Sequence, residues 1–309
     1  MNSSPSLLPV FYHIAKNAGT YTLGWMMMLC RVYSIEMGCR AIPGWTSDRI
    51  RRSIVNVGGH KQLTCVIYTP TDVHINNEHF KSNPSGDGNS DWVDIGHFVE
   101  VIESGEIEVF SVSIDPVGWG STAMTLSDDY SHGYNQHRQA LQLIQQATGR
   151  EHLLNFTILR DPWSRAQSMY NYLTTDASAH EPNHGAIQAE DLIKYINSDE
   201  LEDSWFIRNL LNLSDDTIIE PKHLTACDQY LRHWIVKSIQ NTDQLIDQVF
   251  HGVYGVMRSD VEVEVVDVWR NNTPNKIKLE FNELDDQTQQ TFLDRTYWDR
   301  KLWERYCNS

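Results

Sequence analysis

Two segments of this chain carry residue types that could hold the charged ends of an anionic ligand. The first, residues 13–22, reads HIAKNAGTYT and forms a turn between an apolar run and an apolar helical stretch. A strand-to-helix turn of this kind aims free backbone N–H groups and the positive end of the helix at an anion. Lys16 adds a point charge, and Gly19 lets the backbone approach the ligand closely. The segment therefore predicts an anion-binding loop.

The second segment, residues 156–172, reads FTILRDPWSRAQSMYNY. Its apolar start predicts a strand that ends at Arg160, and Pro162 predicts the first turn of a helix. Arg160 at the strand end and Ser168 on the helix could grip one phosphate, because a guanidinium donates two parallel hydrogen bonds. Arg165, Ser168 and Tyr172 are spaced to share one helix face.

Both segments resemble motifs of the carbohydrate-type sulfotransferases, which use 3′-phosphoadenosine 5′-phosphosulfate (PAPS) as the donor. The first resembles the loop written HIPKTGGTS, and the second resembles the motif TxLRDPxxRxxSxY. The fixed letters of the second motif are matched by Thr157, Leu159, Arg160, Asp161, Pro162, Arg165, Ser168 and Tyr170. The first motif departs from the pattern where Ala15 replaces a proline and Tyr21 replaces a Ser or Thr.

The resemblance implies how the donor is held. Its 5′-phosphosulfate would lie on the first loop, with Lys16 also stabilising the leaving phosphate, and its 3′-phosphate would lie on Arg160 and Ser168. The loop residues implied to bind the donor are Lys16, Asn17, Ala18, Gly19, Thr20, Tyr21 and Thr22. Thr22 offers a hydroxyl where Tyr21 departs from the motif.

Sulfuryl transfer to an alcohol needs a base beside the attacking oxygen. Residues 130–138, YSHGYNQHR, resemble the family's histidine segment and make His132 the first candidate. His97 is the rival, and a carboxylate such as Asp128 or Asp129 is the third possibility. The choice among them stays open.

The implied activity is transfer of a sulfuryl group from PAPS to a hydroxyl acceptor, without a metal. A saccharide is the first expectation for the acceptor, and another hydroxyl-bearing small molecule is the second. Two alternatives stay open. One is a P-loop kinase-like phosphotransferase, although the lysine of the first loop precedes its glycine, unlike GxxxxGK[ST]. The other is a catalytically silent nucleotide-binding protein. The acceptor and the oligomeric state are left open.

The elements that would position these residues alternate along the chain. Strands are predicted at residues 7–14, 63–70, 106–114 and 153–159, and helices at 135–148, after Pro162 and over most of the chain beyond about residue 190. This alternation predicts an α/β fold in three layers, with a mainly parallel sheet flanked by helices. The resemblance narrows it to the P-loop-containing nucleotide hydrolase-like sulfotransferase fold. We expect one domain, 1–309, with a loop-rich insertion around 76–130.

Composition bounds the partners and the compartment. The formal net charge of −16 argues against general nucleic-acid binding, which needs clustered Lys and Arg. Five cysteines, an odd count without a CxxC pair, are typical of reduced thiols and predict a cytoplasmic chain. No run of 18 or more apolar residues occurs, so we expect no membrane anchor.

Overall fold

The computed structural model describes part of the chain. The described residues are 5–14, 18–36, 40–41, 54–57, 61–68, 73–74, 92–93, 99–100, 102–105, 107–114, 134–174, 191–211, 213–214, 216–261 and 277–307. Among the sequence-based predictions, those for residues 15–17, His97, Asp128, Asp129 and His132 lie outside these ranges.

A parallel sheet forms the centre of the fold. Its strands lie side by side in the order β4 (Lys61–Tyr68), β7 (Ile107–Ile114), β1 (Leu7–Tyr12), β8 (His152–Leu159) and β9 (Ile235–Ser238). Each of these strands runs parallel to its neighbour. Short antiparallel strands extend the β4 side: β2 (Arg40–Ala41), β3 (Ile54–Val57), β5 (Val73–His74) and β6 (Trp92–Val93).

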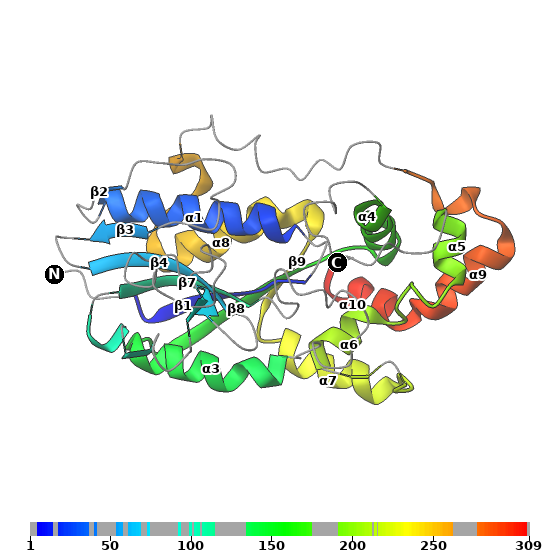
Figure 1. Ribbon diagram of the computed structural model, residues 1–309, viewed down its shortest axis with the longest axis horizontal. Coiled ribbons are helices and arrows are strands. Elements are labelled where there is room, and N and C mark those ends of the chain that lie inside the picture. Colours follow the sequence, from blue (N-terminus) through cyan, green and yellow to red (C-terminus); the bar gives the residue numbers. More distant parts are fainter. Residues whose placement is uncertain are drawn as a thin grey trace.

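Helices cover both faces of the sheet (Figure 1). On one face α1 (Gly19–Glu36) and α8 (Thr242–Tyr254) pack together, and α3 (Tyr134–Ala147) covers the other. The remaining helices are α4 (Pro162–Thr174), α5 (Leu192–Asn197), α6 (Trp205–Leu211), α7 (Pro221–Leu231), α9 (Asp286–Arg295) and α10 (Tyr297–Cys307), with 3₁₀ turns η5 (Ile239–Asn241), η6 (Arg258–Asp260) and η8 (Phe281–Glu283). No described helix has the length and apolar character needed to span a membrane.

The side chains of β1 show why both faces are covered. Successive residues of a strand point to opposite faces. Leu8, Val10 and Tyr12 accordingly join the cluster beneath α3, α6 and α7, whereas Phe11 joins the cluster beneath α1 and α8. All of them are buried. A strand that is apolar on both sides is typical of a parallel sheet sandwiched between helices.

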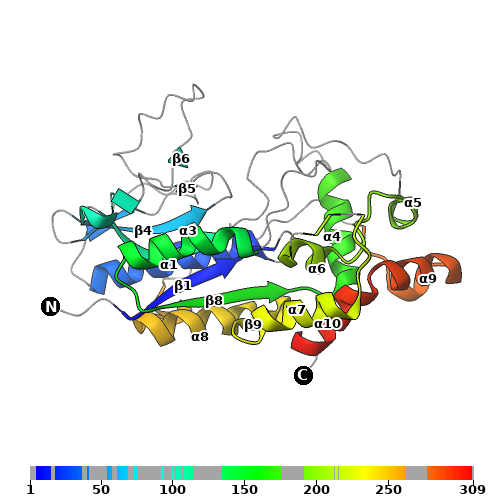
Figure 2. The ribbon, with the colours of Figure 1, turned by 90° about the horizontal axis from the view of Figure 1, so that it is seen from below.

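The strand order places a switch point between β1 and β8. From β1 the chain continues through α1 toward β4 on one side, whereas from β8 it continues toward β9 on the other. In open α/β sheets, ligands bind outside the carboxyl ends of the strands where the connections diverge in this way. Figure 2 shows β1 and β8 side by side, both pointing toward the end where α4 and α6 lie.

The α/β class and the parallel sheet flanked by helices are confirmed, and the narrower sulfotransferase fold stays a prediction. Each predicted strand corresponds to one of β1, β4, β7 and β8, and the predicted helices correspond to α3, α4 and the C-terminal helices. Strand β9 was not predicted and lies within the interval expected to be mostly helical. Strand β7 falls inside the interval 76–130, yet it is a central strand of the sheet.

Candidate functional site

The loop after β1 ends in a backbone conformation suited to anions. Ala18 has φ of 59°, in the left-handed region, and is followed directly by the helical Gly19. The N–H of Thr22 donates to the carbonyl oxygen of Ala18 at 2.9 Å, which starts the helical hydrogen bonding of α1. A left-handed residue beside a right-handed one turns successive N–H groups toward one point and forms an anion-binding nest. Only these backbone groups of the loop are described, because Lys16 and Asn17 lie outside the described residues.

Gly19 is required by the close approach of His13. A Cβ at Gly19 would lie 1.6 Å from Nε2 of the His13 imidazole, well inside any van der Waals contact. His13 is 8% exposed and stacks on Phe11 with ring centroids 5.8 Å apart. Its backbone N–H donates to Ile114 at 2.9 Å, so the residue is also tied to the end of β7. The imidazole thus lies against the first turn of α1.

The hydroxyls of Tyr21 and Thr22 are engaged within the protein. Tyr21 donates to Asp243 Oδ1 of α8 at 2.7 Å, and Arg258 binds the same carboxylate at 2.9 Å. Burial raises the pKa of Tyr21, and the hydrogen bond to Asp243 raises it further. The Thr22 hydroxyl, fully buried, donates to the Ala18 carbonyl at 3.0 Å. These two hydroxyls therefore stabilise the start of α1, and the expectation that Tyr21 and Thr22 bind the donor stays a prediction.

The second segment begins at the end of β8, directly beside β1. Tyr12 and Thr157 are partners in the strand register, and the Thr157 hydroxyl donates to the Tyr12 carbonyl at 2.8 Å. Asp161 then caps α4, because its Oδ2 accepts the Ser164 N–H at 2.8 Å while Pro162 occupies the first turn. The two predicted anion-binding segments consequently start from neighbouring strands at the same edge of the sheet.

Arg160 is fixed by the first turn of α4. Its Nε donates to Ser164 Oγ at 3.1 Å. Burial lowers the pKa of Arg160, Asp161 opposes this shift, and the charge of Arg165 adds to it. The Ser168 hydroxyl, half-buried one turn after Ser164, makes no hydrogen bond within the described part of the chain. Ser168 therefore keeps its full hydrogen-bonding capacity for a ligand.

Other letters of the second motif have structural roles. Arg165 is 6% exposed, and its guanidinium lies 3.6 Å from the ring centroid of Trp205 on α6. Tyr170, at 2% exposed, packs on Tyr195 of α5 with ring centroids 5.7 Å apart. These residues, together with Thr157, hold the strand and helix that present Arg160 and Ser168.

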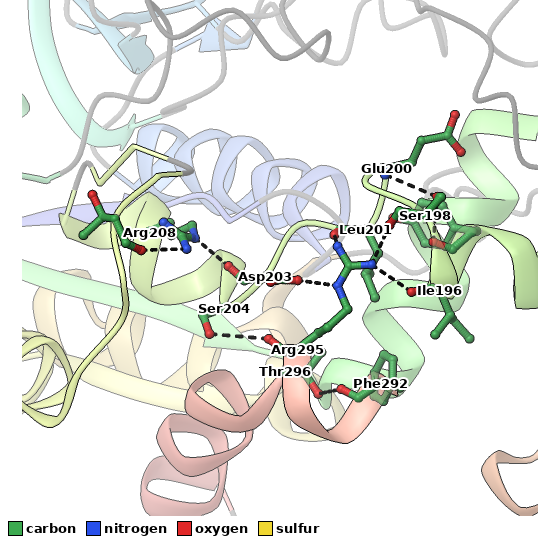
Figure 3. A network of polar contacts seen from close by, with 12 residues as sticks. Ile196, Ser198, Glu200, Leu201, Asp203, Ser204, Arg208, Phe292, Arg295 and Thr296 are labelled. Atoms are coloured by element: carbon green, nitrogen blue, oxygen red, sulfur yellow. Dashed lines mark hydrogen bonds and ion pairs between the residues drawn. The ribbon is translucent and has the colours of Figure 1, made fainter. Parts of the chain in front are cut away.

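The loop between α5 and α6 is clamped by one arginine of α9. Figure 3 shows Arg295 pointing into this loop, where its guanidinium donates to the carbonyls of Ile196, Ser198 and Leu201 and pairs with Asp203. The backbone N–H of Ser204, a residue with φ of 51°, donates to the Arg295 carbonyl at 3.0 Å. The clamp fixes where α6 begins, and hence where Trp205 meets Arg165.

Asp299 of α10 caps the same helix. Its two carboxylate oxygens accept the N–H groups of Phe206 and Ile207 at 2.9 and 3.2 Å. Burial raises the pKa of Asp299 to about 6, although both N–H groups and the charge of Arg165 act in the opposite direction. Neither Asp299 nor Ser164 was among the residues predicted for the site. Ser164 could have been predicted from the sequence, because it lies one helical turn beyond Arg160. The capping role of Asp299 could not, because it joins positions 93 residues apart.

The structure thus brings the backbone of Ala18 and Gly19 to the same edge of the sheet as Arg160, which ends β8 and leads into the helix bearing Ser168. Thr20 is described by its backbone alone. Within the described ranges, no cluster of three or more His, Cys, Asp or Glu side chains could hold a metal ion.

Comparison with known proteins adds no relative to this picture. No protein-family model matches the chain, and neither a curated protein nor a solved structure gives a significant match.

Proposed function

We propose that this chain transfers a sulfuryl group from PAPS to a hydroxyl-bearing acceptor, either a glycan or a small molecule. One observation carries the proposal: the two segments that resemble phosphate-binding motifs follow β1 and β8, which are adjacent parallel strands. A donor with an anionic group at each end needs two such sites at one edge of a sheet. The switch point between β1 and β8 is where an α/β fold binds ligands.

The loop after β1 would bind the 5′-phosphosulfate. The left-handed Ala18 and the first turn of α1 supply backbone N–H groups and the positive end of a helix dipole. Lys16 would add its charge where negative charge grows on the leaving phosphate. Gly19 contributes by letting the backbone and the His13 imidazole pack closely.

The start of α4 would bind the 3′-phosphate. Arg160 is held in place by Ser164, and Ser168 keeps its hydroxyl available for a ligand. A guanidinium and a hydroxyl suit a terminal phosphate, because charge-assisted hydrogen bonds are the strong ones. Anchoring the donor at this end would hold its sulfur in line for attack.

In the proposed reaction the acceptor oxygen forms a bond to sulfur while the bond from sulfur to the bridging oxygen of the 5′-phosphate breaks. His132 would take the proton of the acceptor hydroxyl, with His97, Asp128 or Asp129 as the other candidates. The products are the sulfated acceptor and adenosine 3′,5′-bisphosphate.

Binding measured by calorimetry tests the donor site. Each charge-assisted hydrogen bond contributes roughly 1.5–3 kcal/mol, so adenosine 3′,5′-bisphosphate should bind more than about tenfold better than adenosine 5′-monophosphate. Arg160→Ala should abolish that preference. Tyr21→Phe is the matched control and should leave it unchanged, because the Tyr21 hydroxyl donates to Asp243. Equal affinity of the natural sequence for both nucleotides would contradict the 3′-phosphate site.

Turnover separates the proposed enzyme from its alternatives. With PAPS labelled on sulfur, label should move to a hydroxyl acceptor in a screen of glycans and small alcohols. Tight nucleotide binding without transfer to any acceptor would favour the silent binding protein. A preference for ATP with Mg²⁺ over PAPS would favour the phosphotransferase.

A further inference from the structure

Arg165 carries a buried charge that forms no direct ion pair with a described residue. It lies on α4, 6% exposed, and its Nε is enclosed without a hydrogen bond. Within the described part of the chain its guanidinium makes no hydrogen bond or ion pair, and its close contacts are with the rings of Trp205 at 3.6 Å and Phe206 at 5.4 Å. Ring stacking is favourable for a cation, but it leaves the N–H donors unused.

Asp299 of α10 is a carboxylate that acts on Arg165, but its oxygens bind other groups. Asp299 interacts electrostatically with Arg165, yet both of its oxygens accept backbone N–H groups at the start of α6. Glu202 acts on Arg165 more strongly than Asp299 does, and Arg165 in turn acts on Arg160. Two guanidinium groups near each other repel, and a buried charge without a close partner is costly. A bound anion would relieve both effects.

The helical spacing of α4 directs this charge toward the candidate site. Arg165 and Ser168 are three residues apart and therefore neighbours on the helix surface. On the far side of Ser168, the Asn171 side chain pairs with the backbone of Ile277 through hydrogen bonds of 2.9 and 2.8 Å. Ser164 and Ser168 thus lie on an arc of α4 bounded by Ile277 on one side and by Arg165 with Trp205 on the other.

We propose that Arg165 is a specificity-determining residue, whose buried charge beside Arg160 and Ser168 makes this part of the site selective for a doubly charged terminal phosphate. This inference rests on the proposed function, because it assumes that the 3′-phosphate of the donor lies on α4. The guanidinium lies over the ring of Trp205, in the interior of the protein. The charge of Arg165 therefore acts on the ligand through the low-dielectric interior, where it is weakly screened.

The test compares a variant that removes the charge at position 165 with one that keeps the charge and changes the shape of the side chain. The measured quantity is the ratio of the Kd of adenosine 5′-monophosphate to the Kd of adenosine 3′,5′-bisphosphate, obtained by calorimetry. Arg165→Gln should lower this ratio by about tenfold or more, since one full charge is lost. Arg165→Lys keeps the charge and should retain most of the ratio. Arg208→Gln is the matched control: Arg208 lies on α6 and donates to backbone carbonyls of Asp203 and Thr217, so its loss should leave the ratio unchanged.

A second variant covers the case in which Arg165→Gln does not fold. Glu202→Gln removes a negative charge that acts on Arg165, and it should raise the ratio. An unchanged ratio in both Arg165→Gln and Glu202→Gln would overturn the inference, as would an equal loss in Arg165→Lys and Arg165→Gln. The proposed function fails in a different way, namely if the natural sequence itself shows no preference between the two nucleotides.

Discussion

Gly19 and His13 lie so close together that a larger side chain at position 19 would clash with the imidazole. Because a Cβ at Gly19 would lie 1.6 Å from the His13 imidazole, Gly19→Ala should displace either the imidazole or the start of α1. We expect Gly19→Ala to lower the midpoint of thermal unfolding and to weaken nucleotide binding by more than about tenfold, as overpacking typically costs 1–3 kcal/mol. Adding His13→Ala should restore much of both losses, which a double-mutant cycle would measure as coupling.

A control for this prediction lies on α8. Gly252 is exposed, and a Cβ there would meet no atom within 4 Å. Gly252→Ala should therefore stabilise the protein by about 1 kcal/mol through helix propensity alone. If the effects of Gly19→Ala and His13→Ala on stability and nucleotide binding were additive, the contact between the two residues would not be the cause of the losses.

The candidate ligand-binding residues of the motifs could be predicted from the sequence more readily than the hydrogen-bond partners of their neighbours. Arg160 and Ser168 were identifiable because the strand that ends before Arg160 is followed directly by the helix that carries Ser168, which fixes their relative placement. The partner of Tyr21 was not identifiable, because Asp243 lies 222 residues away and only the packing of α8 on α1 brings the two together. A hydroxyl beside an anion loop is therefore not by itself evidence of ligand contact.

At the scale of elements, Asp299 joins α10 to α6, and its pKa lies in a pH range in which unfolding can be measured. The pKa of Asp299 is about 6 in the folded protein, raised by burial above its usual 3.8. The folded state therefore holds a proton that the unfolded chain has lost, so stability falls as pH rises from about 4 to about 6. Asp299→Asn cannot titrate. The unfolding free energy of the natural sequence minus that of Asp299→Asn should fall by about 3 kcal/mol across this window.

Denaturant unfolding at a series of pH values provides the measurement, and Asp285 provides a control of opposite sign. Asp285 caps α9, and hydrogen bonds from Thr288 lower its pKa. Its contribution to stability is therefore lost as pH falls, so the same difference for Asp285→Asn should rise with pH. Parallel profiles for the natural sequence and Asp299→Asn would contradict a raised pKa at Asp299.

The length of an element decided whether its type could be predicted. The eight-residue strands β4, β7 and β8 show enough apolar residues to be recognised, and α3 shows a clear helical period. Strand β9 has four residues, IVKS, between two helices, and four residues cannot establish a period of two. Its pairing with β8 follows from tertiary contacts that the local sequence does not encode.

At the scale of the whole molecule, the two ends of the sheet have different tasks. The amino ends of β1, β7 and β8 are tied together by Arg150, which is 5% exposed and donates to the carbonyls of Pro5 and Val109 at 2.6 and 3.2 Å. Arg150→Met would remove these donors from the buried carbonyl of Val109 and the part-buried carbonyl of Pro5. We expect it to lower the unfolding free energy by roughly 3 kcal/mol while leaving the nucleotide preference unchanged, because the candidate site lies at the carboxyl ends.

The matched variant is Arg138→Met, which removes an exposed arginine from α3. Surface substitutions of this kind usually change stability by less than about 0.5 kcal/mol. Denaturant unfolding and calorimetry on both variants separate the two ends of the sheet. Loss of nucleotide preference in Arg150→Met, at a level comparable to Arg160→Ala, would contradict the division.

The order of the strands in the sheet could not be predicted from the sequence. Alternation of strands and helices predicts a parallel sheet, but it does not specify that β1 lies between β7 and β8. That placement depends on which packed arrangement buries both faces of β1, a property of all strands at once.

The same strand order shapes how the chain can emerge from a ribosome. Strand β1 is made first, yet its two neighbours begin at residues 107 and 152, so both of its edges stay unpaired while more than a hundred further residues are added. At typical rates of synthesis this lasts on the order of ten seconds. An apolar strand with open N–H and C=O groups is a template for association with other chains. In the folded protein, the central position of β1 protects both of its edges. During synthesis the same position leaves both edges open to association with other chains, so β1 is the strand for which binding by a chaperone would matter most.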